Sequence, residues 1–180
     1  MYFAYIDESG GTEDPLQDKS STPVRTIVTL MVPASAIPQL TRDYVALKTK
    51  YFYQKMQSAR SLDLILAEVK GSELLKMTRS SSRNKRRAAD RFRTELLRLV
   101  ANHGGLITAR VWVKSHGQSL DDRKTYGQAM QDASQHFNAL LEERDDIGVI
   151  VADSRNHESN RQVAHSVFTQ MWRAGTNPYP

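Results

Sequence analysis

The chain has 180 residues, 39% of them hydrophobic and 25% charged, a composition typical of one soluble globular domain with its own core. It contains no cysteine, which excludes a disulfide framework, a cysteine-based zinc site and a thiol nucleophile. Because no segment has the pattern of a signal peptide or of a bilayer-spanning helix, we expect a cytoplasmic protein without a membrane partner.

The formal net charge of +5 is unevenly distributed along the chain. Between Lys76 and Arg98, nine basic residues stand against two acids, so this window alone carries a net charge of +7. The remaining residues together carry −2. The sequence therefore combines one basic segment with a nearly neutral body.

The first elements are two strands joined by a long loop. Tyr2–Ile6 is an apolar, aromatic-rich run that ends before Gly10-Gly11, which predicts a strand. Glu13–Pro23 is polar, with prolines near both ends, and is predicted to be a loop. Val24–Val32 is rich in β-branched residues and predicts a second strand, which would pair with the first as a hairpin.

An amphipathic helix and a third strand are predicted next. The helix is indicated by apolar residues spaced i, i+4, i+7 and i+11. These residues are Leu40, Tyr44, Leu47 and Tyr51. The strand is predicted over Leu64–Gly71, where Glu68 and Lys70 would share one face.

The second half of the chain predicts alternating helices and strands. One helix carries the apolar residues Ala88, Phe92, Leu96, Leu99 and Val100, and another carries Tyr126, Met130, Ala133, Phe137 and Leu140. Between them, Leu106–Lys114 alternates, with Ile107, Ala109, Val111 and Val113 on one face and Thr108, Arg110, Trp112 and Lys114 on the other. This alternation predicts a half-buried strand.

The last two predicted elements are a buried strand and a helix. Gly148–Asp153 is apolar without alternation up to its final acid, which is typical of a central strand covered on both faces. Ser159–Gln162 has the form of a capping box and predicts a helix with Val163, Val167 and Met171 on one side. The element order is that of one α/β domain spanning residues 1–180.

Three acids occupy equivalent places in this pattern. Asp7 and Asp153 end predicted strands, and Glu68 lies near the end of another. In open α/β sheets, ligands bind beyond the carboxyl ends of the strands. Carboxylates gathered there would repel one another unless they held a hard divalent cation such as Mg²⁺ or Mn²⁺. The alternative for each acid is a polar strand end in contact with water.

Side-chain alternation separates the first two acids. Asp7 would project to the same face as Tyr5 and Ser9, and Glu8 to the opposite face with Ile6. The two carboxylates are therefore not expected to bind one ion. Asp7 is the better candidate for a metal, and Glu8 is expected to have another role.

Three short motifs occur in a fixed order: YIDESGG (Tyr5–Gly11), EVKGSEL (Glu68–Leu74) and VIVADSRNHESN (Val149–Asn160). Together they resemble a family of bacterial and phage proteins known as domain of unknown function 3800, whose fold is similar to ribonuclease H. The resemblance implies a mixed sheet of about five strands flanked by helices. It also implies that acids at the strand ends bind divalent metal for phosphodiester hydrolysis.

By position, the resemblance makes Asp7, Glu68 and Asp153 the metal ligands. Five further residues match motif positions without an assigned role: Glu8, Ser9, Lys70, Ser72 and Asn160. Family members continue into another strand and a helix with a Leu-Gln-x-Ala-Asp motif, which this sequence lacks. We therefore expect either a naturally short member or a C-terminally truncated one, without one acidic ligand.

Basic residues are the second functional candidate. Arg83, Arg87 and Arg91 are spaced i, i+4 and i+8 and would form one stripe on a helix. Such a stripe binds nucleic-acid phosphates without reading sequence, and the alternative is a solvated helix face. The residues expected to contact nucleic acid are Arg79, Arg83, Lys85, Arg86, Arg87 and Arg91.

Two smaller groups leave alternatives open. Lys70 would contact a phosphate or neutralise the carboxylates, or it would form a salt bridge with Glu68 on the same strand face. His157 and His165 would belong either to a weak zinc site or to the polar surface near a helix cap.

Taken together, these patterns indicate a divalent-metal-dependent nuclease with catalytic residues Asp7, Glu68, Asp153 and Lys70. The alternative is a catalytically inactive protein of a phage-defence or mobile-element system that binds nucleic acid or another partner. A shortened C-terminus would expose apolar surface, and a homodimer would cover it.

Overall fold

The computed structural model describes residues 1–15, 22–56, 61–153, 161 and 164–169. The chain divides into two compact units. The sheet unit consists of Met1–Met31 and Ile107–Pro180, and the helical unit consists of Val32–Leu106. One unit therefore contains two stretches of chain that lie far apart in the sequence.

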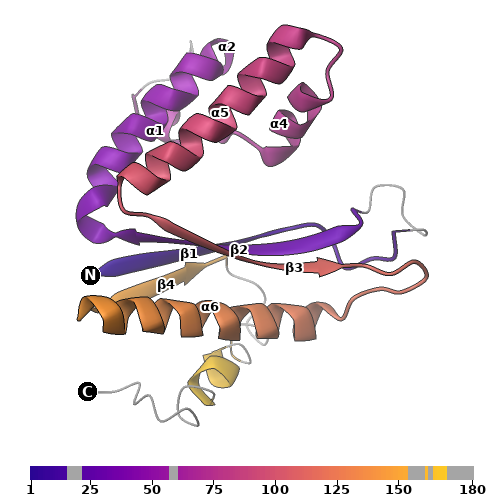
Figure 1. Cartoon of the computed structure of the whole chain (residues 1–180), viewed down its shortest axis with the longest axis vertical. Coiled ribbons are helices and arrows are strands. Elements are labelled where there is room, and N and C mark those ends of the chain that lie inside the picture. The colour runs from indigo at the N-terminus through magenta and orange to yellow at the C-terminus, as the bar shows by residue number, and fades with distance from the viewer. Residues whose placement is uncertain (16–21, 57–60, 154–160, 162–163, 170–180) are drawn as a thin grey trace. The chain divides into compact units, whose positions relative to one another are not determined.

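The sheet unit is organised around four strands. They are β1 (Tyr2–Ser9), β2 (Val24–Pro33), β3 (Leu106–Val113) and β4 (Gly148–Ala152). The described strands form one mixed sheet with the order β3-β2-β1-β4, in which β2 runs opposite to its neighbours (Figure 1). The inner strand β1 pairs with β4 in parallel, from Tyr2 opposite Gly148 to Ile6 opposite Ala152.

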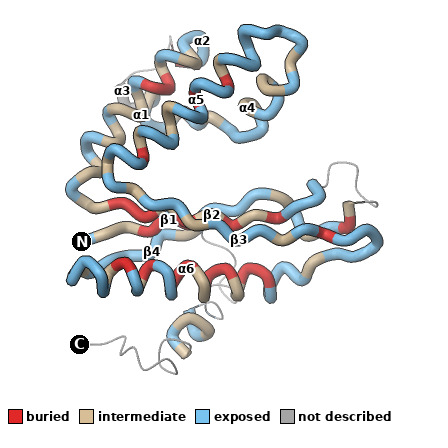
Figure 2. The backbone as a smooth tube through the Cα atoms, in the orientation of Figure 1, coloured by how far each residue is buried: buried red, intermediate tan, exposed pale blue. Residues whose placement is uncertain are grey.

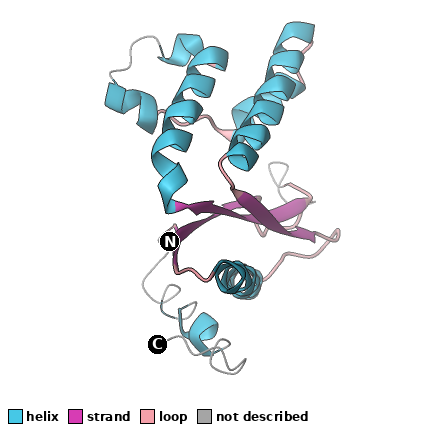
Figure 3. Ribbon diagram, turned by 60° about the vertical axis from the view of Figure 1, so that its left-hand side comes forward, coloured by secondary structure: helices cyan, strands magenta, loops and turns pink. Residues whose placement is uncertain are grey.

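Helix α6 (Asp122–Arg144) lies along one face of this sheet (Figure 3). Its buried side is visible in Figure 2. Two clusters of buried residues join helix and sheet: Ile6, Ile27, Tyr126, Ala129, Met130 and Ala133, and Ala4, Met31, Phe137 and Leu140. Burying one large apolar side chain contributes about 1.5–3 kcal/mol, so this face contributes much of the unit's stability. The apolar spacing predicted for this helix is confirmed.

The face of β3 that packs toward α6 is the one that carries Arg110 and Trp112. Alternation had predicted this face to be the polar, solvent-facing one. Trp112 packs against the core cluster, and Arg110 pairs with Asp132 of α6. On the opposite face, the side chains of Val111 and Val113 are exposed. The indole supplies the apolar contact area, and Arg110 reaches the charged flank of the helix. Alternation therefore predicted the strand but not which face is covered.

Strand β4 is an edge strand of the described sheet, so the predicted central position is wrong. Val149, Ile150 and Val151 are each at least 36% exposed. An uninterrupted apolar run indicates a buried segment only when neighbouring elements cover both faces. Here α6 covers one face, and β1 is the only strand that pairs with β4 among the described residues.

The helical unit begins with the short 3₁₀ turn η1 (Ala34–Ala36) and contains five α-helices in its described residues. They are α1 (Ile37–Tyr51), α2 (Tyr53–Met56), α3 (Ser61–Leu66), α4 (Gly71–Thr78) and α5 (Arg83–Asn102). The ring of Phe92 on α5 makes edge-to-face contacts with Tyr51 and Phe52, at centroid distances of 5.7 and 5.1 Å. These contacts join α1 to α5 through an aromatic cluster in which Phe92 is buried and Tyr51 and Phe52 are half-buried.

Charged groups at the surface add to the α1–α5 pairing. Lys50 Nζ donates to Glu95 at 2.8 Å, and the Tyr51 hydroxyl donates to the same carboxylate at 2.6 Å. The hydrogen bond from Lys50, followed by that from Tyr51, lowers the pKa of Glu95. The carboxylate form of Glu95 is therefore the form that joins the two helices.

The predicted strand over Leu64–Gly71 is wrong. Its first residues belong to α3, Ala67–Lys70 form a connection, and α4 begins at Gly71. The expected count of about five strands consequently falls to four in the described residues. The apolar run Leu64–Leu66 is too short for its periodicity to distinguish helix from strand.

The other predicted elements agree with the structure. The first two strands and the helices within α1, α5 and α6 lie where the sequence places them. Residues 164–169 are helical, and Val167 among them packs against the core of the sheet unit. Ser159, Asn160 and Gln162 of the expected capping box lie outside the described residues. In the part of the chain that is described, no helix combines the length and apolarity needed to cross a membrane.

Two glycines test how tightly α6 packs against the sheet. A Cβ added to Gly148 on β4 would lie 2.3 Å from Cζ of Phe137, whereas a Cβ on Gly127 within α6 would meet nothing within 4 Å. We expect Gly148→Ala to lower the free energy of unfolding by about 1–3 kcal/mol through overpacking. Gly127→Ala should raise it by up to about 1 kcal/mol through helix propensity.

Urea unfolding followed by circular dichroism measures both effects on otherwise identical proteins. Equal shifts of the two midpoints in the same direction would contradict the packing of Phe137 beneath Gly148.

Candidate functional site

Parallel pairing brings two of the predicted acids together. The last residues paired between β1 and β4 are Ile6 and Ala152, and Asp7 and Asp153 each come next along the chain. Neighbouring strands lie about 4.8 Å apart, so these acids occupy adjacent positions at the carboxyl ends of the two strands. Both residues are exposed. Asp7 lies within β1, which continues to Ser9 beyond the predicted end at Ile6, whereas Asp153 directly follows β4.

The carboxylate of Asp7 is only partly used within the protein. Its Oδ1 accepts a hydrogen bond from the backbone N–H of Glu8 at 2.8 Å. Among the described residues, no lysine, arginine or histidine forms an ion pair with Asp7 or Asp153. Two adjacent carboxylates without a basic partner can share a cation through oxygen ligands.

Glu8 points to the opposite face of β1, as alternation predicts. Its Oε2 accepts a hydrogen bond from Arg25 Nη2 at 3.1 Å, and Arg25 Nη1 contacts Asp122 Oδ1 at 2.6 Å. Arg25 is only 2% exposed, so its charge is buried between these two carboxylates. Glu8 thus helps to hold the end of β1 to the start of α6.

Arg25 is a structural residue of this region that sequence reasoning missed. It stands alone as a charge in the β-branched run Val24–Val32, and that was the available signal. A buried cation is stable only when counter-charges compensate for its lost hydration. Its Nε has no hydrogen-bond partner in the described structure, so the two carboxylates carry most of this compensation.

Steric constraints explain why glycine occupies position 10, after the two acids. Gly10 has φ +84°, and a Cβ there would lie 2.3 Å from the carbonyl oxygen of Val24. Only glycine adopts this conformation at so short a distance without strain. The loop that follows is held by the buried Lys114, whose Nζ donates to the carbonyls of Gly11 and Glu13 at 3.2 and 2.9 Å.

Glu68 lies in the helical unit, in the connection between α3 and α4, and its side chain is exposed. Lys55 Nζ donates to the backbone carbonyl of Glu68 at 2.6 Å and pairs with Glu73 at 3.0 Å. Glu68 therefore lies in a loop that is held by Lys55, and not in the predicted strand. Because the two units are described separately, its role as a third ligand beside Asp7 and Asp153 stays a prediction.

A second lysine, Lys48, orders the same connection. It is 1% exposed, and its Nζ donates to the carbonyls of Leu64, Ile65 and Ala67 at 2.7, 3.2 and 2.8 Å. Burial, with a contribution from Lys55, lowers the pKa of Lys48. Three carbonyl acceptors nevertheless match the three protons of an ammonium group, so Lys48 serves to cap the end of α3.

The charge of Glu68 acts on a neighbouring aromatic residue. Burial, followed by the negative charge of Glu68, raises the pKa of Tyr44. Lys70 caps the start of α4 through its backbone carbonyl, which accepts a hydrogen bond from Glu73 N at 3.0 Å. The described structure contains no salt bridge between Lys70 and Glu68, so that alternative is not supported.

The remaining motif residues lie on exposed positions or outside the description. Ser9 ends β1 and Ser72 lies in the first turn of α4, and both are exposed. Asn160 and His157 lie outside the described residues. His165 is described, and its Nδ1 is 3.5 Å from the hydroxyl of Thr169 in the same helix.

The basic segment runs from Lys76 in the last turn of α4 to Arg98 in α5, and most of its basic residues lie on α5. Ser82 caps this helix with its side chain, and Arg86 Nη1 donates to the carbonyls of Ser80 and Ser81. The six candidate contact residues are all exposed: Arg79, Arg83, Lys85, Arg86, Arg87 and Arg91. Neither Arg83 nor Arg87 forms an ion pair within the described residues, so their charges are available to an anionic partner.

No group of three or more histidine, aspartate or glutamate side chains in the described residues could hold a metal ion. Within the sheet unit, the structure makes Asp7 and Asp153 neighbours. No known protein family, curated protein or solved structure matches the chain.

The shared contact of Glu8 and Asp122 with Arg25 gives a prediction about stability. Each single variant, Glu8→Gln or Asp122→Asn, leaves Arg25 one counter-charge, whereas the double variant leaves a buried cation without either. The loss of unfolding free energy in the double variant should therefore exceed the sum of the single losses by about 0.5–3 kcal/mol. Urea unfolding of the four proteins in a double-mutant cycle measures this difference.

An additive result would contradict a joint role of the two carboxylates. The matched pair Glu143→Gln and Asp90→Asn, which share no partner, provides the additive reference.

Proposed function

We propose that the protein is a divalent-metal-dependent nuclease with a ribonuclease H-like fold. The observation that carries the proposal is the parallel register that makes Asp7 and Asp153 neighbours at the carboxyl ends of β1 and β4. The motif resemblance to domain of unknown function 3800 supports the same two acids. Glu68 is the proposed third ligand.

The chemistry of the donors fits a hard divalent cation. Asp7 and Asp153 offer carboxylate oxygens, which Mg²⁺ and Mn²⁺ prefer as protein ligands. The neighbouring Glu8 is engaged by Arg25, so it is not free to act as a ligand in the same way. Asp7 and Asp153 would hold the metal, with Glu68 completing the set.

A bound divalent metal would supply an activated water and stabilise negative charge on the phosphate oxygens. The residues of the chain hold and orient the substrate. Asp7 and Asp153 position the cation at the edge of the sheet, and Lys70 contacts a phosphate oxygen. The exposed arginines of α5 bind the nucleic-acid backbone, with no dependence on base sequence.

Cleavage assays test the catalytic part of the proposal. RNA, DNA and hybrid substrates are incubated with Mg²⁺ or Mn²⁺ and with the wild-type protein, Asp7→Asn or Asp153→Asn. We expect cleavage that needs the metal and falls about 100-fold or more in either variant, because stabilisation of the developing charge is lost.

Glu143→Gln, which removes an exposed carboxylate at the far end of α6, is the matched control and should cleave like wild type. Circular dichroism shows that each variant is folded. No cleavage of any substrate, or full activity of Asp7→Asn, would refute the catalytic proposal.

A second candidate is a nucleic-acid-binding protein without catalysis. The exposed stripe of Arg83, Arg87 and Arg91 favours it independently of the acids. Such a protein would bind nucleic acid equally well with and without divalent metal. Binding without cleavage in the assays above would favour this second candidate.

Charge reversal tests the stripe. In Arg83→Glu/Arg87→Glu/Arg91→Glu, we expect the affinity for RNA and DNA to fall at least about 10-fold. The slope of log affinity against log salt concentration should become shallower by the equivalent of about two to three phosphate contacts. Fluorescence anisotropy at several salt concentrations measures both quantities.

The control carries the same charge change on three exposed basic residues of α6: Arg123→Glu/Lys124→Glu/Arg144→Glu. An equal loss of affinity in both triple variants would show a general charge effect rather than a binding surface on α5.

A further inference from the structure

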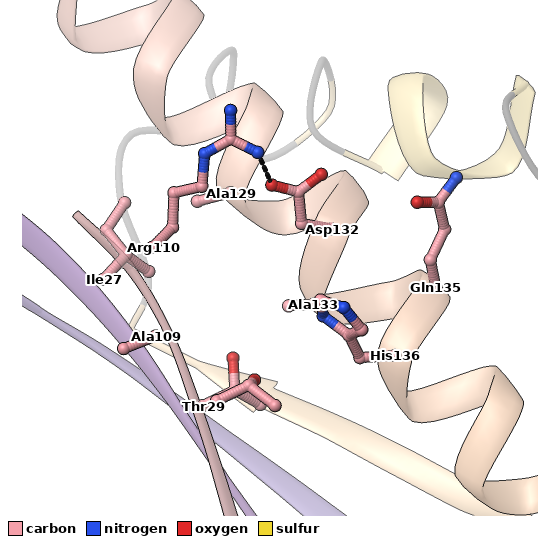
Figure 4. Close-up of a pocket in the computed structure, with 10 residues that line it drawn as sticks. Ile27, Thr29, Ala109, Arg110, Ala129, Asp132, Ala133, Gln135 and His136 are labelled. Carbon is pink, nitrogen blue, oxygen red and sulfur yellow. Dashed lines mark hydrogen bonds and ion pairs between the residues drawn. The ribbon is translucent and has the colours of Figure 1, made fainter. Parts of the chain in front are cut away.

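A pocket of about 300 Å³ lies within the sheet unit, between α6 and the strands β2 and β3 (Figure 4). Small side chains on α6 explain the space: Ala129 and Ala133 line it opposite β2 and β3. Small-molecule sites begin at about this volume, so the pocket fits a ligand of modest size. It lies on the α6 side of the sheet, whereas Asp7 projects to the other face of β1.

Opposite charges meet at the pocket wall. Arg110 of β3 pairs through Nη1 with Oδ2 of Asp132 on α6. In the described structure, Nε and Nη2 of Arg110 make no hydrogen bond, and Oδ1 of Asp132 accepts none. Each partner therefore keeps unused groups: the donor nitrogens Nε and Nη2 on the guanidinium and the acceptor oxygen Oδ1 on the carboxylate.

The floor of the pocket adds a buried polar group. Thr29 on β2 is 3% exposed, and its hydroxyl has no hydrogen-bond partner among the described residues. The hydroxyl oxygen of Thr29 is not one of the fully buried atoms without a partner, so it can bond to a water or a ligand in the pocket. Thr108 and His136 line the same space. Figure 4 shows Thr29 on the sheet and His136 on the helix.

We propose that this pocket binds a small zwitterion of the α-amino acid class. The ligand carboxylate would pair with the free donors of Arg110, and the ligand ammonium group with Oδ1 of Asp132. A simple anion would meet the charge of Asp132, and a simple cation that of Arg110. The alanines leave room for a short side chain, and the Thr29 hydroxyl bonds to a ligand oxygen.

The site contains its own optical reporter. The Arg110 guanidinium lies 5.5 Å from the centre of the Trp112 ring. A ligand that shifts the guanidinium therefore changes indole emission. The chain has two tryptophans, and Trp172→Phe leaves Trp112 as the single emitter. The experiment titrates the Trp172→Phe protein with each of the common amino acids, with acetate and with methylamine.

We expect saturable binding of one or more amino acids and weak binding of acetate or methylamine alone. In Arg110→Gln and in Asp132→Asn, affinity should fall about 10- to 100-fold, because each variant removes a charge-assisted hydrogen bond. Arg93→Gln and Asp90→Asn alter an exposed ion pair on α5 and should leave the affinity unchanged.

Thr29→Val separates a ligand contact from a structural role. Without ligand, its melting temperature should equal that of wild type, because the hydroxyl makes no hydrogen bond within the described residues. With ligand, its affinity should fall about 2- to 10-fold through the lost hydrogen bond.

The proposal is overturned if no amino acid binds up to millimolar concentrations. It is also overturned if acetate binds as tightly as the amino acids, or if both pocket charge variants keep wild-type affinity. None of these outcomes depends on nuclease activity.

Discussion

The parallel pairing of β1 with β4 is the constraint on which the rest of the sheet unit depends. Two parallel neighbours cannot be joined by a tight turn, and the chain reaches β4 through the long helix α6. The same helix covers one face of the sheet and supplies its core. Because Gly148 has no side chain, Phe137 can lie against the start of β4. Parallel direction then places the carboxyl ends of both strands at one edge.

The acids at this edge have different electrostatic surroundings. Arg25 is buried, and Glu8 and Asp122 supply the negative charge that makes its burial tolerable. Asp7 and Asp153 have no comparable basic neighbour in the described structure. One pair of acids therefore holds elements together, and the other pair stays open to a cation. Adjacent residues on one strand divide between these roles because alternate side chains project to opposite faces.

Local patterns predicted much of the fold, and the errors have identifiable causes. Helical spacing located α1, α5 and α6, and β-branched runs located β2 and β4. The segment around Glu68 was misread because three consecutive apolar residues fit either type of element. Lys48 and Lys55 order that connection through backbone carbonyls. Contacts between a lysine and carbonyls distant in sequence leave no periodic pattern to read.

The sequence by itself determined the main helices, the strands β1 to β4, the basic segment on α5 and the separation of Asp7 from Glu8. These features follow from spacing within one element. Only the tertiary structure decided that β4 lies at an edge, that β3 turns Trp112 inward, and that Asp153 neighbours Asp7. It also revealed the buried Arg25 and the pocket beside Arg110. Such features depend on which elements pack together, and the free energy of that packing comes from residues far apart along the chain.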